Sequence, residues 1–260
     1  MITGASSGIG AATALAFAKK GARLELAARR ADRLDDVARR CSKAGAADVN
    51  VREVDVAERG RAHALIATVL RTHERLDLLV NNAGMGWMGR LHQMPEEKVD
   101  ELIAVNLRGV ISMTQAALPW MLERRRGVII NVASVTGFRA APYSAVYSAT
   151  KHAVVGLSHA MRGELSGSGV KVCVVYPGVT AGTEFYNETE RPVGPAYPAW
   201  WVADLIVRTA RFPRRDAMVV PLRLGHFAEP VLGGLIDHAL GEARRLVSPH
   251  LRGTGLPSRR

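Results

Sequence analysis

Short apolar runs alternate with longer amphipathic segments along the first two-thirds of the chain. The short runs have the aliphatic, β-branched composition of strands and cover residues 22–28, 48–56, 76–80, 127–133 and 170–177. Segments whose apolar residues recur at helical spacing occupy residues 8–20, 31–43, 58–73, 96–123 and 145–167. Because strands that alternate with helices form parallel sheets covered on both faces, the pattern predicts an α/β fold of three layers.

The last third of the chain follows a different pattern. Residues 181–200 combine three prolines with aromatic side chains, a composition typical of a substrate lid. A helix at about 199–211, a strand at 217–222 and an apolar stretch at 225–240 follow. No repeat or linker divides the sequence, so we expect one domain over residues 1–260, with a lid at about 181–200 and a C-terminal appendage at about 223–260.

The formal net charge of +11 changes this picture little. Arginines are spread over most helices, and no helix-turn-helix or zinc-finger spacing accompanies them, so we expect no nucleic-acid partner. Cys41 and Cys173 form neither a disulfide nor a metal-ligand pattern, which predicts a cytoplasmic protein without a metal. The first apolar run has no basic residues before it, so neither an export signal nor a spanning helix is expected.

The apolar stretch at 225–240 has two interpretations, a membrane-surface helix or a contact between subunits. Pro230 and the pair Gly233-Gly234 interrupt any regular amphipathic stripe. We therefore favour a subunit contact, and expect a homodimer or homotetramer rather than a membrane-bound protein.

A glycine-rich turn opens the chain. Residues 3–10 read TGASSGIG and lead directly into a helical pattern, the context in which such a turn binds a dinucleotide. Backbone N–H groups and the helix N-terminus would surround the pyrophosphate. The expected contacts are Gly4, Ser6, Ser7, Gly8, Ile9 and Gly10. The strand before the turn is very short. A first strand of ordinary length would need further residues before Met1, so we expect the natural start of the chain to lie upstream.

The end of the second strand indicates which dinucleotide binds. Ala28 stands where an acid would hold the ribose hydroxyls, and Arg29 and Arg30 follow. A guanidinium here binds a 2′-phosphate, so the sequence favours NADP(H) over NAD(H). Arg29 lies nearer the strand end, whereas Arg30 could equally begin a solvated helix.

Polar residues also follow the third and fourth strands. Asp55, next to Val56, either contacts the adenine edge or caps the following helix, and the two roles are compatible. Buried asparagines at strand ends usually brace neighbouring turns, so we expect Asn81 and Asn82 to have a structural role beside the cofactor. The expected cofactor contacts in this region are Asp55, Val56, Asn82, Ala83 and Gly84.

Two residues of the predicted helix at 145–167 carry the candidate chemistry. Tyr147 and Lys151 are four apart and share one helix face, so the ammonium favours the phenolate and lowers the pKa of the tyrosine toward the range useful for proton transfer. Ser134, at the end of the fifth strand, could bond the same substrate oxygen or only cap a turn. Asn106 is either a fourth member of this set or a helix-bending core residue.

These motifs, with NNAG at 81–84 and YPG at 176–178, resemble the short-chain dehydrogenase/reductase family over residues 1 to about 190. The resemblance implies a Rossmann sheet of about seven strands and hydride exchange between a nicotinamide and a carbonyl or alcohol. It implies that Tyr147 gives or takes the proton and that Lys151 also binds the nicotinamide ribose. Ser134 would hold the substrate oxygen, and Asn106 would support a water relay.

The resemblance also implies contacts with the nicotinamide. Pro177 and Gly178 would flank it, and either Thr180 or Thr183 would meet its carboxamide. The substrate pocket would be lined by Met85, Trp87, Met88 and Phe138 and by Phe185 and Tyr186 of the lid.

We therefore expect an NADP(H)-dependent oxidoreductase that acts on the carbonyl or secondary alcohol of a small-to-medium apolar substrate. The alternative is a non-catalytic NADPH-binding scaffold or regulator, a role that would not need Ser134, Tyr147 and Lys151 together.

Overall fold

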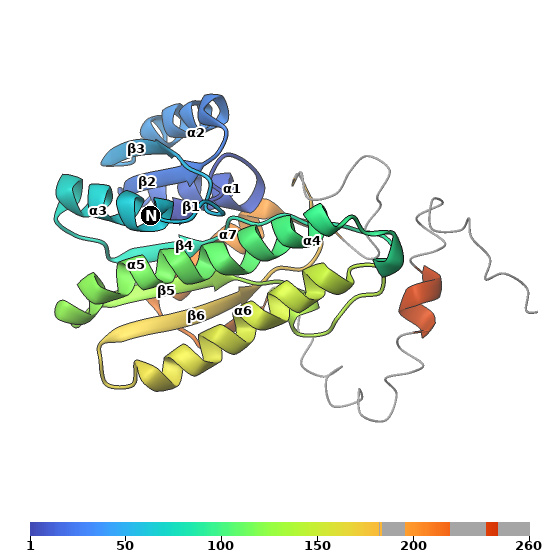
Figure 1. Ribbon diagram of the computed structural model, residues 1–260. Helices are drawn as coiled ribbons and strands as arrows, with labels where there is room; N and C mark the ends of the chain where they lie inside the picture. Colours follow the sequence, from blue (N-terminus) through green and yellow to red (C-terminus); the bar gives the residue numbers. More distant parts are fainter. Residues whose placement is uncertain (182, 184–195, 219–237, 244–260) are drawn as a thin grey trace, which may run out of the picture.

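A parallel sheet of seven strands forms the centre of the molecule (Figure 1). The computed structural model describes residues 1–181, 183, 196–218 and 238–243 of the chain. The strands lie in the order β3-β2-β1-β4-β5-β6-β9, and all neighbours are parallel. Their bounds are β1 Ile2–Thr3, β2 Arg23–Ala28, β3 Asp48–Glu53, β4 Leu78–Asn81, β5 Gly127–Val132, β6 Val170–Tyr176 and β9 Asp216–Met218. This confirms the doubly wound, Rossmann-type fold.

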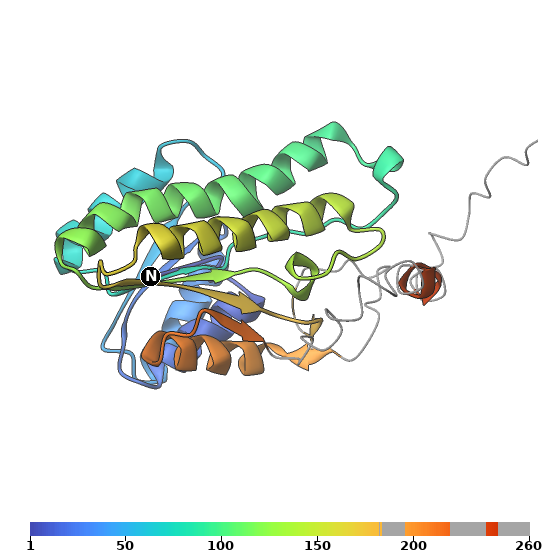
Figure 2. The same cartoon turned by 90° about the horizontal axis from the view of Figure 1, so that it is seen from below.

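Helices cover both faces of the sheet, which gives the three expected layers (Figure 2). One face carries α1 (Gly8–Ala18), α2 (Ala31–Lys43) and α7 (Ala199–Arg211). The other carries α3 (Arg61–His73), α5 (Gly109–Glu123) and α6 (Ala145–Glu164). The helix α4 (Glu96–Ile103) continues into α5 through a π-helical turn at Ala104–Arg108.

The core explains why the strands are nearly continuous apolar runs. Ile130 packs into the core beneath α1 and α7, whereas its neighbour Ile129 packs into the core beneath α3 and α5. Both are completely buried. Because the central strands are buried on both faces, an alternating pattern of apolar and polar residues would leave polar groups in one of the two cores, whereas the partly exposed edge strand β3 does alternate.

The first strand is as short as the sequence predicts, yet it is paired on both sides. Ile2 lies opposite Leu26 of β2 and Val80 of β4, and Thr3 lies opposite Ala27. Ile2 and Thr3 are each only 1% exposed. The glycine-rich turn therefore starts from the middle of the sheet.

Two predicted helices differ from those in the structure. The helix expected over 58–73 begins at Arg61, because Asp55 and Ala57 form a turn first and Gly60 is the N-cap residue. The helix expected over 96–123 is interrupted by the π-helical turn, where one residue is inserted into the helical repeat.

The predicted lid is only partly described. The strand β7 (Thr180–Ala181) pairs in parallel with β8 (Tyr197–Pro198), and Trp200 belongs to α7 instead of the lid. Phe185 and Tyr186 lie outside the described residues. The same holds for residues 219–222 of the predicted last strand and for 225–237 of the apolar stretch.

The described ranges contain neither a membrane-spanning helix nor a cluster of metal ligands. None of their helices combines the length and the apolar character required to cross a bilayer. In these ranges no three His, Cys, Asp or Glu side chains gather in a way that could hold a metal ion.

Candidate active site

One cavity of about 910 Å³ lies at the carboxyl ends of the strands. It extends from the glycine-rich turn, past the residues after β4, to the start of α6. Nearly all the candidate residues in the described part line it: Gly4, Ser6, Ser7, Gly8, Ile9, Arg29, Arg30, Asp55, Val56, Asn82, Ala83, Gly84, Trp87, Phe138, Ser134, Tyr147, Lys151, Pro177, Gly178 and Thr180. Gly10 and Asn106 are not among the lining residues, but Gly10 packs on Gly4 and Asn106 is hydrogen-bonded to Met85, and both of these partners line the cavity.

The glycine-rich turn is held against the loop that follows β4. Gly4 and Gly8 have φ values of +64° and +53°, which side chains with a Cβ rarely adopt. A Cβ on Gly10 would overlap with the carbonyl oxygen of Gly4, so this glycine allows α1 to pack on the turn. Asn82 donates through Nδ2 to the carbonyl oxygens of Thr3 (3.0 Å) and Gly4 (3.2 Å). This confirms the bracing role expected for the asparagines.

A buried polar chain runs beneath the same loop. Nδ2 of Asn81 donates to Oγ1 of Thr114 at 3.1 Å and to Oδ1 of Asn131 at 2.9 Å. Asn131 in turn donates to Oγ of Ser158 on α6 at 2.8 Å. The chain thus connects β4, β5, α5 and α6 just below the site. Asn131 lies within a strand run that has no turn signal, so its role could not be predicted from the sequence.

The two arginines after β2 are placed differently from each other. Arg30 donates through Nη2 to Oγ of Ser6 (3.2 Å) and of Ser7 (3.0 Å), so its guanidinium lies over the glycine-rich turn. Arg29 is 67% exposed, and its Nη1 lies 3.7 Å from Oδ2 of Asp55. Arg30, although further from the strand end, is therefore more than the start of a solvated helix.

Asp55 caps a local turn rather than a helix. Its Oδ1 accepts a hydrogen bond from the backbone N–H of Ala57 at 2.8 Å, and α3 begins only at Arg61. The helix-cap interpretation of Asp55 is therefore wrong. Its carboxylate borders the cavity, where the adenine interpretation places it.

The helix α6 places Tyr147 and Lys151 on the cavity wall. The two residues are 9% and 5% exposed, and Nζ of Lys151 lies 5.8 Å from the centre of the Tyr147 ring. Lys151 donates to the carbonyl oxygen of Val132 at 3.0 Å, and burial lowers its pKa from 10.5 to about 8. A small change in surroundings can therefore change the charge of this ammonium near neutral pH.

Ser134 has the capping role, and its bond to a substrate oxygen stays a prediction. Its Oγ accepts a hydrogen bond from the N–H of Thr136 at 3.1 Å and so caps a 3-10 helix at Val135–Gly137. The same side chain lines the cavity with Tyr147 and Lys151. A hydroxyl fixed in this way retains its proton for a further acceptor.

Asn106 lies in the π-helical turn and fixes the loop after β4. Its Oδ1 accepts from the N–H of Met85 at 2.9 Å, and its Nδ2 donates to the carbonyl oxygen of Met85 at 2.9 Å and to Thr150 at 3.2 Å. A Cβ on Gly84 would lie 3.3 Å from Oδ1 of Asn106 and 3.5 Å from Nζ of Lys151. The position of Asn106 thus suits either interpretation, and its place in a water relay stays a prediction.

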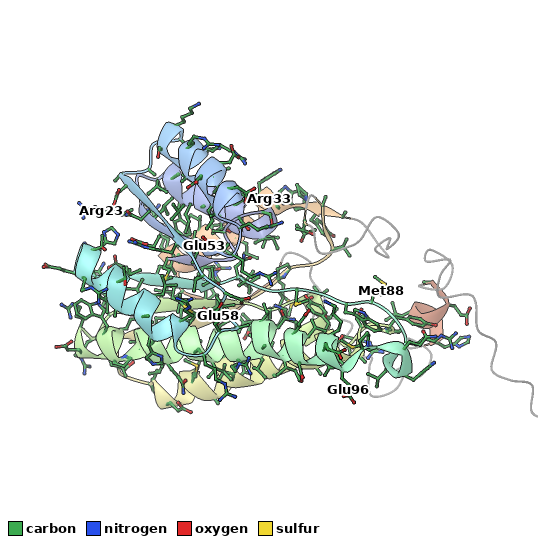
Figure 3. The ribbon with its side chains drawn as sticks, turned by 45° about the horizontal axis from the view of Figure 1, so that its top comes forward. Arg23, Arg33, Glu53, Glu58, Met88 and Glu96 are labelled. Atoms are coloured by element: carbon green, nitrogen blue, oxygen red, sulfur yellow. The ribbon has the colours of Figure 1, made fainter. Side chains whose placement is uncertain are left out.

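The substrate end of the cavity is mainly apolar. Met85, Trp87, Met88 and Phe138 line it, and Phe138 packs edge-on against Tyr176 with ring centres 6.3 Å apart. Figure 3 shows Met88 at the opposite end of the molecule from Arg23, the first residue of β2. This agrees with a cavity at the carboxyl end of the sheet.

Two further residues line the cavity: Arg139, which was not predicted from the sequence, and Thr183, which was predicted only as an alternative to Thr180. Arg139 follows the 3-10 helix, in a stretch without a recognisable motif. Thr183 donates to the carbonyl oxygen of Thr180 at 3.0 Å, and its methyl carbon lies 3.0 Å from the place of a Cβ on Gly8. Thr180 and Thr183 thus both border the cavity, with Thr183 over the glycine-rich turn.

The short chain dehydrogenase family matches residues 1–193. An uncharacterized oxidoreductase of Staphylococcus aureus (strain USA300) is 38% identical over 193 residues, which are 74% of this chain and 82% of the relative. One from Staphylococcus saprophyticus is 38% identical over 183 residues, 70% of this chain and 73% of the relative.

Two solved structures are similar to this fold. An alcohol dehydrogenase from the archaeon Thermococcus sibiricus, complexed with 5-hydroxy-NADP, is 29% identical with a TM-score of 0.76, and the match covers 84% of this chain and 94% of that one. A metagenomic short-chain oxidoreductase in complex with NADP is 33% identical with a TM-score of 0.73, and the match covers 84% and 93%.

Proposed function

The chain belongs to the short-chain dehydrogenase family, and on this premise we propose that it is an NADP(H)-dependent oxidoreductase acting on a carbonyl or secondary alcohol. The substrate is small to medium in size and mainly apolar. One observation carries the proposal: Ser134, Tyr147 and Lys151 line a single cavity that continues without interruption to the glycine-rich turn.

The residues at the turn suit a phosphorylated dinucleotide. The positive φ of Gly4 and Gly8 and the N-terminus of α1 provide a cradle for a pyrophosphate. Arg29 and Arg30 border the same end of the cavity, and Ala28 brings no carboxylate there. Both similar solved structures are complexes with NADP or a derivative of it, which supports NADP(H) here too. When bound, the nicotinamide supplies or accepts the hydride.

The chain's own residues handle the proton and the oxygen. Ser134 donates a hydrogen bond to the carbonyl oxygen of the substrate and orients it. Tyr147 gives that oxygen its proton during reduction and takes it back during oxidation. The ammonium of Lys151 stabilises the phenolate that forms, because a positive charge close to a phenol lowers its pKa. The apolar wall around Trp87 and Phe138 keeps water away from the reacting carbon.

A substrate panel tests the proposal. Oxidation of NADPH is followed with ketones, aldehydes and quinones, and with NADH as the control cofactor. We expect turnover of at least one carbonyl class and a clear preference for NADPH. Failure of NADPH to bind, or turnover by NADH alone, would refute the cofactor assignment.

Replacement of Tyr147 tests the chemistry. Tyr147→Phe removes the proton donor and should lower kcat by about 10²- to 10⁴-fold while NADPH still binds. Tyr143→Phe is the matched control, because Tyr143 lies four residues earlier and is not among the residues that line the cavity. A fully active Tyr147→Phe variant would show that another group transfers the proton.

A further inference from the structure

Exposed cations gather at one end of the fold. In a parallel sheet the connections that lead from a helix to the next strand all lie at the amino ends of the strands, opposite the cavity. Three of these connections are basic: residues 19–22 read KKGA, residues 124–126 read RRR and residues 212–215 read FPRR. Every lysine and arginine in them is exposed. We refer to these three connections together as the basic end.

Few acids balance these cations. Among the described helix-to-strand connections, only that between α3 and β4, at residues 74–77, contains carboxylates. The acids at the neighbouring ends of helices and strands are Asp48, Glu123, Glu164 and Asp216. Two of these already pair with arginines, Glu123 with Arg124 and Asp216 with Arg162. The exposed cations outnumber the acids, so this end of the molecule has a positive potential that attracts anions.

The arginine turn at residues 124–126 has a fixed shape. Arg125 has a φ of +50°, a left-handed conformation that a residue with a Cβ keeps only where its surroundings impose it. Its Nη2 donates to the carbonyl oxygen of Gly167 at 2.9 Å. A Cβ on Gly169 would overlap with the carbonyl oxygen of Arg125. The turn between α6 and β6 therefore packs directly against the arginine turn and holds it in place.

Two apolar side chains accompany the cations. Leu122, near the end of α5, is 40% exposed, and Phe212, directly after α7, is 63% exposed. The guanidinium of Arg211 lies 5.3 Å from the centre of the Phe212 ring. The described helix-to-strand connections are only three to five residues long, so none of them projects far from this end. The result is a nearly flat, positive surface with exposed apolar groups.

Such a surface is complementary to an anionic bilayer. Lysine and arginine attract acidic lipid headgroups, and each cation near the bilayer strengthens binding about fivefold. Exposed phenylalanine and leucine side chains enter the boundary between headgroups and acyl chains. Nucleic acid also attracts cations, but its phosphates offer nothing to an exposed leucine. We propose that the basic end binds the anionic surface of a phospholipid bilayer.

This surface is separate from the cavity and from the apolar stretch at 225–240, on which the expected subunit contact was based. Figure 3 shows Arg23, which follows residues 19–22, at the opposite end of the molecule from Met88 of the cavity wall. A protein bound by its basic end would turn the cavity away from the bilayer and leave it open to a dinucleotide. The proposal goes beyond the proposed function and does not depend on it.

Co-sedimentation of the full chain with vesicles tests the proposal. Vesicles of phosphatidylcholine with about 30 mol% phosphatidylglycerol are compared with vesicles of phosphatidylcholine alone, in about 0.1 M salt. We expect binding to the anionic vesicles to be stronger by about tenfold or more, and to weaken as salt screens the charges. Equal sedimentation with both kinds of vesicle, or with neither, would overturn the proposal. Tighter binding to a short DNA duplex than to the anionic vesicles would indicate a nucleic-acid surface and would overturn it too.

Paired substitutions locate the binding surface. Arg214→Gln with Arg215→Gln removes two cations and should weaken vesicle binding by about 10- to 30-fold. Arg59→Gln with Arg61→Gln is the matched control, because both residues are exposed near the start of α3, at the cavity end, and neither lines the cavity. This pair should weaken binding by less than about threefold, since its charges lie beyond a Debye length from the bilayer. Arg126→Gln, on a separate turn, should cost about fivefold and replaces the first pair if that pair does not fold.

Two further variants separate the basic end from the rest of the charge. Phe212→Ser keeps every cation and should still weaken binding by about fivefold or more, because an apolar side chain no longer enters the bilayer. Arg259→Gln with Arg260→Gln removes two cations from the end of the sequence and should have a smaller effect than the pair at 214 and 215. Equal losses in all three arginine pairs would show that the vesicles bind the total charge, and would overturn the proposal.

Discussion

The two ends of helix α6 each bury a cation, but they surround it differently. Near the end of the helix, Arg162 is 10% exposed and forms two hydrogen bonds with the carboxylate of Asp216 on β9, at 3.2 and 3.3 Å. Its Nε also donates to the carbonyl oxygen of Val172 at 3.0 Å. Near the start of the helix, Lys151 is 5% exposed and donates to a backbone carbonyl, that of Val132.

The pKa values record this difference. Burial alone would raise the pKa of Asp216, but the charge and hydrogen bonds of Arg162, with a hydrogen bond from Tyr176, hold it below its usual value. Lys151 has no such compensation, and burial lowers its pKa to about 8. A compensated charge holds an edge strand on the sheet, whereas an uncompensated one in the cavity wall is available for chemistry.

Removal of the charge at Lys151 should have the largest effect. Lys151→Met should lower kcat by about 10²-fold or more, because the phenolate of Tyr147 loses its stabilising cation. The free energy of unfolding at pH 7 should stay the same or rise, since an uncompensated ammonium is no longer buried. Steady-state assays and urea titrations measure the two quantities.

The control for this variant is Lys171→Met, because Lys171 is an exposed lysine on β6. It should change neither quantity appreciably. A Lys151→Met protein that is destabilised by several kcal/mol, with normal kcat per folded molecule, would show that Lys151 is structural and would remove the contrast between the two ends.

Removal of the charge at Arg162 should have the opposite pattern. Arg162→Met leaves the carboxylate of Asp216 without its main partner, and a broken buried pair of this kind lowers the free energy of unfolding by about 3 kcal/mol, the low end of the usual range because Asp216 is 23% exposed. The activity per folded molecule should change by less than about twofold, since neither residue lines the cavity. Urea titration and active-site titration with NADPH separate the two quantities.

A double-mutant cycle with Asp216→Asn makes this prediction sharper. If the ion pair is responsible, the two substitutions together should be less destabilising than the sum of the single effects, by about 1 kcal/mol or more. Strict additivity would show that Arg162 contributes through its backbone contacts alone.

The low pKa of Lys151 predicts how stability depends on pH. In the absence of cofactor the folded protein releases this proton at about pH 8, and the unfolded chain at about 10.5. Between these values the unfolded state binds more protons, so the free energy of unfolding rises with pH. Below pH 8 both states hold the proton, and the full penalty of burying the charge is present.

The corresponding measurement compares the wild-type protein with Lys151→Met. The variant's advantage in free energy of unfolding should shrink by about 2 kcal/mol between pH 7.5 and 9.5. Over about 1.5 pH units of this range the folded wild-type protein has released the Lys151 proton, whereas the unfolded chain still holds it. Because both proteins share all other titrating groups, their difference isolates Lys151. A difference that does not vary with pH would place the folded pKa of Lys151 near its ordinary value.

Much of this site could be predicted from the sequence, because the motifs lie at strand ends. The carboxyl ends of parallel strands meet at one edge of the sheet, so the glycine-rich turn, Asn82, Ser134 and Pro177 had to lie near one another once the strands were recognised. The helices at 31–43 and 199–211 also have their predicted bounds, since a clear amphipathic stripe marks both.

The features that the sequence did not reveal depend on partners distant in the chain. The residues of the π-helical turn would suit a regular α-helix equally well. The turn is held by hydrogen bonds from Asn106 to Met85 and Thr150, 21 and 44 residues away. The pair Arg162 and Asp216 is 54 residues apart. Neither has a local signal, and the three-dimensional arrangement alone brings these groups together.

Replacement of His159 should have the smallest effect. His159 shares α6 with Arg162 and approaches the same carboxylate, with Nε2 at 3.5 Å from Oδ1 of Asp216, but its side chain is 50% exposed. An exposed pair of this kind contributes little because water and salt screen it, so His159→Gln should lower the free energy of unfolding by less than about 0.5 kcal/mol. The same urea titration, with Arg162→Met alongside, measures it.

The result decides what stabilises this end of α6. If burial of the Arg162–Asp216 pair is the important factor, the effect of His159→Gln should be several times smaller than that of Arg162→Met, although both residues touch one carboxylate. It should also be further reduced in 0.5 M salt, since a Debye length of about 4 Å leaves little attraction between exposed groups. A loss comparable to that of Arg162→Met would mean that Asp216 depends on all its partners together, and that burial of the Arg162–Asp216 pair is not what stabilises this end of the helix.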